Sequence, residues 1–165
     1  MKIGLLSDTH GFLDPTLSTH FSACDEIWHA GDIGDRAVTD GLGKITSLRA
    51  VHGNIDDPSM RNSFLEDLWF ECEGVLVFLT HIAGKPPSYN PRVRKLINAK
   101  HPHLLICGHS HILQVKKDEE NNLLFINPGA AGQQGFHTVR TAIRMEIESG
   151  AVRKLEVIEL GKRGV

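Results

Sequence analysis

The chain has 165 residues, of which 41% are hydrophobic and 23% are charged, and its formal net charge is −2. These values are typical of a single globular domain over residues 1–165 with a sizeable core. The balance of charge argues against stable binding of nucleic acid, which usually needs a basic surface, but it does not exclude a small nucleotide as a substrate. Length and charge are compatible with a monomer and with a homo-oligomer.

The N-terminal segment offers no targeting signal. Its apolar run ends at Ser7 and Asp8, whereas a secretory signal needs a longer apolar region and a small-residue cleavage site. No apolar stretch approaches the roughly 20 residues of a membrane span. The three widely spaced cysteines, at positions 24, 72 and 107, favour reduced thiols. We therefore expect a cytoplasmic protein without a membrane partner.

Short apolar runs bounded by glycine or polar residues predict five β-strands in the first two thirds of the chain. Nearly continuous apolar runs suit strands that are buried on both faces. The predicted strands cover residues 2–6, 26–30, 48–51, 74–80 and 103–107.

Three segments between these strands have helical character. Asp14 is a plausible N-cap with Pro15 at the first helical position, and Asn90 is a plausible N-cap before Pro91. The alternation of strands and helices predicts an α/β layered fold. The predicted helices cover residues 13–23, 34–45 (interrupted by two glycines) and 90–100.

The last third of the chain changes to a pattern of strands. Residues 114–127 predict two strands joined by a turn at 119–122. Residues 141–149 and 152–160 alternate around Gly150 and predict a hairpin. The tail at 161–165 is expected to be frayed.

Two histidines, His109 and His111, stand one residue apart directly after the apolar run 103–107. Side chains alternate along an extended chain, so the two imidazoles can point to the same side. A polar turn with surface histidines is the ordinary interpretation, and metal binding is the alternative, since histidine is the commonest metal ligand. The choice depends on whether the rest of the chain supplies partners.

Polar residues of a similar kind follow all five predicted strands. In open α/β sheets, ligands bind outside the carboxyl ends of the strands, so these side chains could converge on one crevice. Carboxylate, imidazole and amide groups all bind metal ions in their deprotonated or neutral forms. Each residue alone could cap a turn or lie on the surface, but the full set predicts a metal site. The predicted ligands are Asp8, His10, Asp32, Asn54, His81, His109 and His111.

Seven ligands are too many for one tetrahedral site, and they suit two metal ions that share a carboxylate. Two-metal sites hold their ions about 3.5–4 Å apart and promote in-line displacement at phosphorus. A shared carboxylate is expected after a central strand, and Asp32 is the candidate.

Five short motifs, in this order, resemble the five blocks of the calcineurin-like metallophosphoesterases. They are D-x-H at 8–10, GD at 31–32, GNID at 53–56, His81 after an apolar run, and GHSH at 108–111. The start MKIGLLSDTHG and the later NPGA at 127–130 resemble, more narrowly, the small bacterial and archaeal phosphodiesterases. These are relatives of the retromer subunit of the same fold.

The resemblance implies an α/β fold in which two mixed β-sheets pack as a sandwich with helices on the outer faces, in four layers. It also implies a phosphodiesterase in which a hydroxide that bridges two divalent metal ions attacks a small phosphodiester in line with the leaving oxygen. Mn²⁺ is the first expectation, and Fe²⁺, Zn²⁺ and Ni²⁺ suit the same ligands. One ion would be held by Asp8, His10, Asp32 and His111, and the other by Asp32, Asn54, His81 and His109.

The sequence departs from the larger phosphatases of the family at Ile55, where they carry a histidine thought to protonate the leaving oxygen. General acid catalysis typically contributes about 10²–10⁴-fold, so either the substrate has a good leaving group or another residue supplies the proton. His137 in the segment 129–137 is the candidate donor, and a surface histidine is the alternative. His29 and Asp56 are expected to support the ligands or the turns around them.

A non-catalytic alternative is a scaffold that binds a protein partner, like the retromer relative, around a vestigial metal site. Fold alone does not separate the two. The ligand set does favour the enzyme, because all seven ligand positions are filled here.

Overall fold

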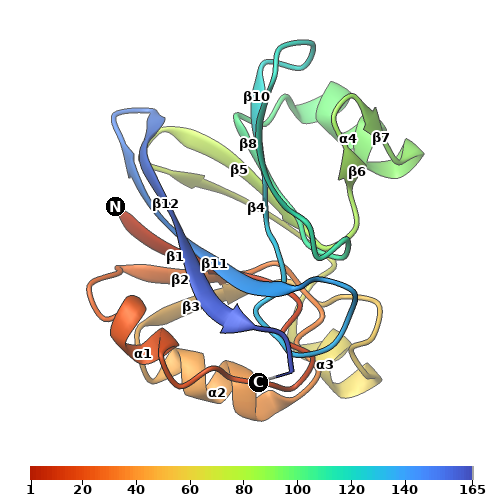
Figure 1. Cartoon of the computed structure of the whole chain (residues 1–165). Helices are drawn as coiled ribbons and strands as arrows, with labels where there is room; N and C mark the ends of the chain where they lie inside the picture. The colour runs from red at the N-terminus through yellow and green to blue at the C-terminus, as the bar shows by residue number, and fades with distance from the viewer. Residues whose placement is uncertain (165) are drawn as a thin grey trace.

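The computed structural model describes residues 1–164 and contains two five-stranded mixed β-sheets (Figure 1). In the first sheet the strand order is β12-β11-β1-β2-β3. Strands β1, β2 and β3 are parallel, whereas β11 is antiparallel to β1 and β12 is antiparallel to β11. The strands are β1 (Lys2–Leu6), β2 (Glu26–His29), β3 (Ser47–Ala50), β11 (Val139–Glu148) and β12 (Ala151–Lys162).

The second sheet has the order β4-β5-β8-β10-β9. Its central strands β5, β8 and β10 are parallel, and the edge strands β4 and β9 are antiparallel to their neighbours. A two-stranded ribbon, β6 (Gly84–Lys85) with β7 (Ser88–Tyr89), follows β5. The sheet consists of β4 (Asp67–Cys72), β5 (Val75–Thr80), β8 (Leu104–Ile106), β9 (Leu113–Asp118) and β10 (Leu123–Pro128).

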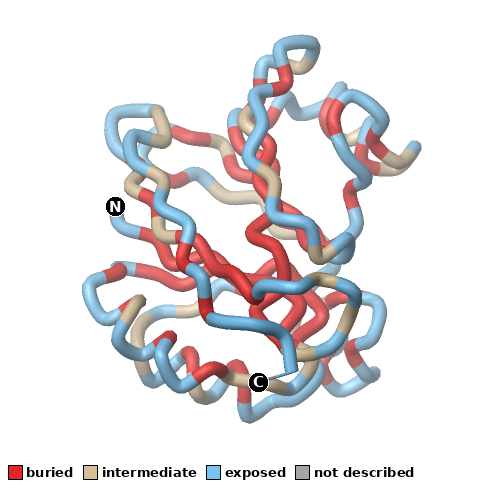
Figure 2. The backbone as a smooth tube through the Cα atoms, viewed as in Figure 1, coloured by how far each residue is buried: buried red, intermediate tan, exposed pale blue. Residues whose placement is uncertain are grey.

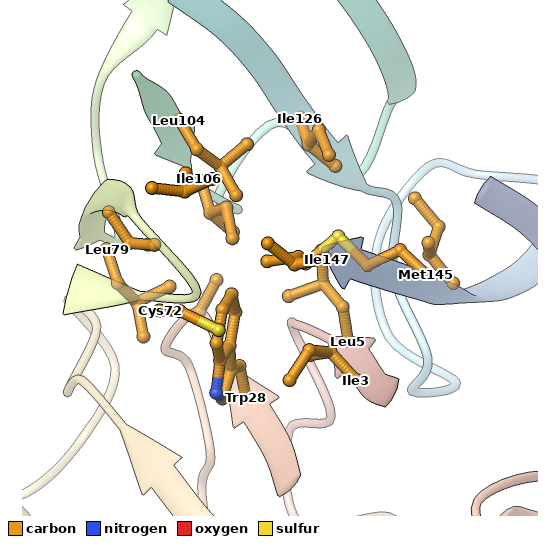
Figure 3. Packing of buried hydrophobic residues seen from close by; sticks show 14 of the residues in the cluster. Ile3, Leu5, Trp28, Cys72, Leu79, Leu104, Ile106, Ile126, Met145 and Ile147 are labelled. Carbon is orange, nitrogen blue, oxygen red and sulfur yellow. The ribbon is translucent and has the colours of Figure 1, made fainter. Parts of the chain in front are cut away.

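The two sheets pack face to face over the main hydrophobic core. Buried positions are concentrated between the sheets and on the sheet-facing sides of the helices (Figure 2). Each fully buried aliphatic or aromatic side chain contributes about 1.5–3 kcal/mol. Figure 3 shows this core, which includes Ile3, Leu5, Trp28, Leu79, Leu104 and Ile126.

Helices cover the outer face of each sheet, which gives the four layers expected of the fold (Figure 1). Helices α1 (Leu17–His20), α2 (Arg36–Gly43) and α3 (Pro58–Ser63) contribute buried residues to a cluster on the first sheet. Helix α4 (Pro91–Lys100) packs Val93 and Ile97 on the second sheet. Within residues 1–164, no helix is long and apolar enough to cross a bilayer.

Most of the predicted elements are confirmed, and the differences have local causes. The helix predicted over 13–23 is reduced to the four residues of α1, which begins after Thr16, although Asp14 accepts from Thr16 N as an N-cap would and also pairs with Arg140. Gly41 lies inside α2 and does not interrupt it, whereas Gly43 is its last residue, so the helix ends two residues before the predicted end. Four elements were not predicted: the helix α3, the half-buried edge strand β4 and the two short strands of the ribbon, β6 and β7.

The predicted C-terminal strand is longer than expected. Strand β12 continues to Lys162, and the backbone N–H of Arg163 donates to Thr138 O at 3.0 Å. The tail is therefore paired with β11 and not frayed over most of its length. Residue 165, which the same prediction included, lies outside the described residues.

Candidate metal centre

The predicted ligands lie where the carboxyl ends of strands from both sheets meet. Two of them follow β1, one follows β2 and one follows β3, all in the first sheet. The others follow β5 and β8 of the second sheet, whose ends are joined by a hydrogen bond from Gly108 N to His81 O at 3.0 Å. The site therefore lies at the seam of the sandwich.

The first donor group consists of Asp8, His10 and His111, whose ligand atoms all lie within 4.8 Å of one another. His111 Nε2 is 3.2 Å from Asp8 Oδ1 and 3.3 Å from His10 Nε2. Asp8 is fully buried and also accepts from the backbone N–H of His109 at 3.1 Å. One carboxylate thus ties the end of β1 to the segment after β8.

The second donor group consists of Asp32, His81 and His109, again within 4.8 Å. His81 Nε2 is 3.2 Å from Asp32 Oδ1 and 3.2 Å from Asn54 Oδ1. The other oxygen of Asp32 lies 3.7 Å from His10 Nε2 in the first group. Asp32 therefore stands between the two groups, where the sequence analysis placed a shared carboxylate.

Five of these seven residues adopt the left-handed backbone conformation, which non-glycine residues rarely do. Such strain costs about 1–3 kcal/mol per residue and persists only when the surroundings impose it. Backbone hydrogen bonds from Asp8 N to Gly31 O and from His10 N to Asp32 O hold two of these turns in place. The φ angles are 54° at Asp8, 49° at His10, 54° at Asp32, 69° at His109 and 58° at His111.

Two glycines allow the turns to approach the carboxylates closely. A Cβ atom on Gly53 would lie 2.0 Å from Asp32 Oδ1, and one on Gly108 would lie 1.9 Å from Ser7 Oγ and 2.6 Å from Asp8 Oδ2. No side chain can occupy these positions without moving the carboxylates.

His29 and Asp56 hold together the segments that carry the ligands. His29 is buried, accepts from Gly31 N at 3.2 Å and contacts Thr9 Oγ1 at 2.9 Å, and burial lowers its pKa to about 4. Its neutral ring therefore joins the segments after β1 and β2. Asp56 accepts from the backbone N–H groups of residues 33, 34 and 53, which ties the Asp32 turn to the Asn54 turn.

In the described part of the chain, the two carboxylates of the site are buried and have no permanently charged side chain as a partner. Asp8 is 0% exposed and Asp32 is 3% exposed, and within residues 1–164 their only ion-pair partners are histidines. Burying unpaired carboxylates is costly, and metal ions are one of the usual ways to compensate it. The donor set of two carboxylates, four imidazoles and one amide oxygen fits two divalent ions.

His81 shows how the site is prepared for an ion. Its Nδ1 lies 2.8 Å from Ala30 O, so Nδ1–H donates to that carbonyl and Nε2 faces Asp32. Burial disfavours charge on the ring, but the hydrogen bond to Asp32 and the nearby Asp8 outweigh it and raise the pKa of His81. An ion at Nε2 therefore competes with a proton, so ion binding should weaken as the pH falls.

The residue suggested as the proton donor, and the one that stands where the larger phosphatases carry a histidine, both lie close to the site. Ile55, in the family's histidine position, is 44% exposed. His137 has its Nδ1 3.3 Å from His111 Nδ1 and its Nε2 3.0 Å from Gly132 O. Both ring nitrogens of His137 are thus engaged, and its role as a proton donor stays a prediction.

Arg61 is a site residue that the sequence analysis did not identify. It lies on α3 and donates to Asn54 O and Asp56 O, at 2.7 Å each, so it holds the Asn54 turn. Arg61 also lines a cavity with Asn54 and His81. The helix that carries it was not predicted, and the isolated arginine gave no other signal.

The fold and the site define a metallophosphoesterase, and the comparison with known families agrees. The family model of the calcineurin-like phosphoesterase superfamily domain matches residues 1–150. The chain therefore belongs to the calcineurin-like phosphoesterase superfamily, whose members are metal-dependent phosphoester hydrolases.

Individual proteins that resemble the chain agree with this family. A protein of Methanocaldococcus jannaschii described as a probable metallophosphoesterase is 28% identical over 165 residues, which cover 96% of this chain and 82% of the relative. Among solved structures, a single-site variant of Vps29 from Entamoeba histolytica superposes with a TM-score of 0.75 at 18% identity, covering 96% of this chain and 99% of that one. A structure described as a novel archaeal phosphodiesterase gives 0.74 at 22% identity, covering 96% and 100%. At these identities, the structural matches establish the fold alone.

Proposed function

We propose that this chain is a phosphodiesterase that works with two divalent ions. The observation that carries the proposal is the pair of donor groups joined through Asp32, which stands 3.2 Å from His81 Nε2 and 3.7 Å from His10 Nε2. Asp8, His10, Asp32 and His111 would hold one ion, and Asp32, Asn54, His81 and His109 would hold the other. When bound, two such ions lower the pKa of an attacking water and neutralise charge on the phosphoryl oxygens.

The protein's own groups would orient these ligands and the substrate. Asp56 and Arg61 hold the Asn54 turn, and the carbonyl of Ala30 fixes the ring of His81. These ligand side chains are therefore held in one arrangement before an ion binds. This kind of preorganisation is what makes electrostatic stabilisation of a transition state effective.

Two cavities, each lined by a histidine of the second donor group, favour a diester over a monoester. One, of about 190 Å³, opens beside His81 and Asn54 and is also lined by Arg61 and Arg92. The other, of about 390 Å³, opens beside His109 and is also lined by Lys85 and Ile112. The first is smaller than a typical site for a drug-sized ligand and the second is at the low end of that range, so each suits one substituent of a small phosphodiester.

We propose Mn²⁺ as the first ion to test, with Fe²⁺, Zn²⁺ and Ni²⁺ as alternatives. Carboxylate and imidazole ligands do not separate these ions strongly. One of the similar structures, a Vps29 from Entamoeba histolytica, is described as a complex with Zn²⁺, so a chain of this fold takes up that ion.

The second candidate function is a scaffold that binds a protein partner over the same face. Exposed apolar residues lie next to the proposed ligands in the sequence: Ile55 after Asn54 and Ile112 after His111, with exposed fractions of 44% and 65%. Such residues around a site are typical of contact surfaces as well as of substrate subsites. The similarity to Vps29 structures gives this candidate a precedent in the fold.

Hydrolysis of bis-p-nitrophenyl phosphate by chelator-stripped protein separates the two candidates. We expect turnover that depends on added Mn²⁺ and is faster than for the monoester p-nitrophenyl phosphate. The aryl leaving group needs little help from a general acid, so the absence of a histidine at position 55 should not hide the activity. Ion binding without turnover by any of the four metals would contradict the enzyme and favour the scaffold.

A further inference from the structure

The segment between β10 and β11 packs against the Nδ1 side of the His111 ring. Ala131 N donates to Ser7 O at 2.9 Å and Gly132 N donates to Asp8 O at 3.0 Å, so the start of this segment is fixed to the end of β1. A Cβ atom on Gly135 would lie 2.1 Å from His111 Nδ1. The ring of His111 is therefore held between Asp8 on its Nε2 side and residues 132–137 on its Nδ1 side.

The hydrogen bonds along this segment determine where the ring protons lie. A carbonyl oxygen can only accept, so the contact of 3.0 Å between Gly132 O and His137 Nε2 requires the proton to be on Nε2. A neutral His137 then has a bare Nδ1, which accepts. The proton in the 3.3 Å contact between the two Nδ1 atoms must therefore belong to His111.

The position of the His111 proton determines which ring nitrogen can bind a metal ion. A histidine that carries its proton on Nδ1 offers the lone pair of Nε2, and His111 Nε2 is the atom that faces Asp8 and His10. We propose that His137 is a positioning residue, which fixes the tautomer and the orientation of His111 so that its bare Nε2 meets the ion held with Asp8 and His10. Removing a hydrogen-bond partner of this kind typically costs about 10–100-fold in metal affinity.

His81 has the same arrangement, except that its Nδ1 proton is accepted by a backbone carbonyl and not by a side chain. There the Nδ1 proton goes to Ala30 O, and Nε2 faces Asp32. Within residues 1–164 no backbone carbonyl accepts from His111 Nδ1, so His137, itself held by Gly132 O, supplies the acceptor. One ligand histidine in each donor group thus has a fixed tautomer.

The test compares two substitutions that differ in one hydrogen bond. His137→Phe keeps a ring over His111 but removes the acceptor, whereas His137→Asn keeps an oxygen near the position of Nδ1 that can accept from His111. Calorimetric titration of chelator-stripped protein with Mn²⁺ should show one of two ions bound about 10–100-fold more weakly in His137→Phe. His137→Asn should stay within a few-fold of the wild type, and His20→Phe on α1 should leave the titration unchanged.

The histidine ring tautomers of the metal-free protein give an independent measurement. Long-range ¹H–¹⁵N spectra should show His111 protonated on Nδ1 in the wild type and in His137→Asn, and a mixture of tautomers in His137→Phe. Wild-type titration and wild-type spectra in His137→Phe would overturn the proposal, as would an equal loss of affinity in both substitutions. The inference rests on the proposed ion site but not on the reaction, because a protein that binds two ions without hydrolysing a diester would refute only the proposed enzyme.

Discussion

Asp32→Asn should abolish the binding of both ions and reduce turnover by at least about 10³-fold, as measured by Mn²⁺ titration and by bis-p-nitrophenyl phosphate hydrolysis. The carboxylate of Asp32 faces a histidine Nε2 in each donor group, with Oδ2 at 3.7 Å from His10 Nε2 and Oδ1 at 3.2 Å from His81 Nε2. Metal ions supply several kcal/mol of transition-state stabilisation, and each 1.4 kcal/mol is about tenfold in rate.

The substitution is chosen to preserve the local structure. An asparagine oxygen can still accept the hydrogen bond that Ile55 N donates to Asp32 Oδ1 at 3.0 Å, so the two turns should stay joined. Asp40→Asn, at an exposed position of α2, is the matched control and should behave as the wild type. Undiminished binding of two ions by a folded Asp32→Asn protein would show that the two sites do not share this residue.

His109→Ala and His111→Ala should each remove a different ion. His111 belongs to the donor group of Asp8 and His10, and His109 belongs to the group of Asp32 and His81. Each variant should therefore retain one tightly bound Mn²⁺ and lose about 100-fold or more of the turnover, because in-line displacement between two metals needs both. Metal analysis of the dialysed proteins, alongside circular dichroism for folding, measures both effects.

The control for the loss of a histidine is His101→Asn. His101 ends helix α4 in a left-handed conformation that asparagine tolerates, and it lies outside the donor groups. Full activity in His109→Ala or in His111→Ala would remove that residue from the ligand set. Loss of both ions in each variant would mean that the two sites fill only together.

Much of the fold could be predicted because the central strands are buried on both faces. The run of β8 is apolar throughout and that of β5 is apolar up to Thr80, and hydrophobic burial dominates the choice of structure there. Strand β4 escaped prediction because its residues are mostly half-buried and include Asp67 and Glu71, so neither alternation nor an apolar run marks it. Its pairing with β5 stabilises it, and that tertiary contact is absent from the local sequence.

The candidate site was predictable in composition but not in geometry. The order of Asp, His and Asn residues after the strands indicated the seven ligands, and the structure brings them into two groups. The meeting of the two sheets at one seam, the left-handed turns at Asp8 and Asp32 and the contact between His111 and His137 depend on packing between distant segments. A single histidine in a loop, such as His137, carries no sequence signal that separates a proton donor from a positioning residue.

The most direct test of the two-ion site is a calorimetric titration of chelator-stripped wild-type protein with Mn²⁺ at two pH values. The two donor groups around Asp32 predict two Mn²⁺ per chain, and the raised pKa of His81 predicts that protons are released and that affinity is lower at the lower pH. A single ion per chain, or no binding at millimolar Mn²⁺, Zn²⁺, Fe²⁺ and Ni²⁺, would contradict the two-ion site and the phosphodiesterase built on it.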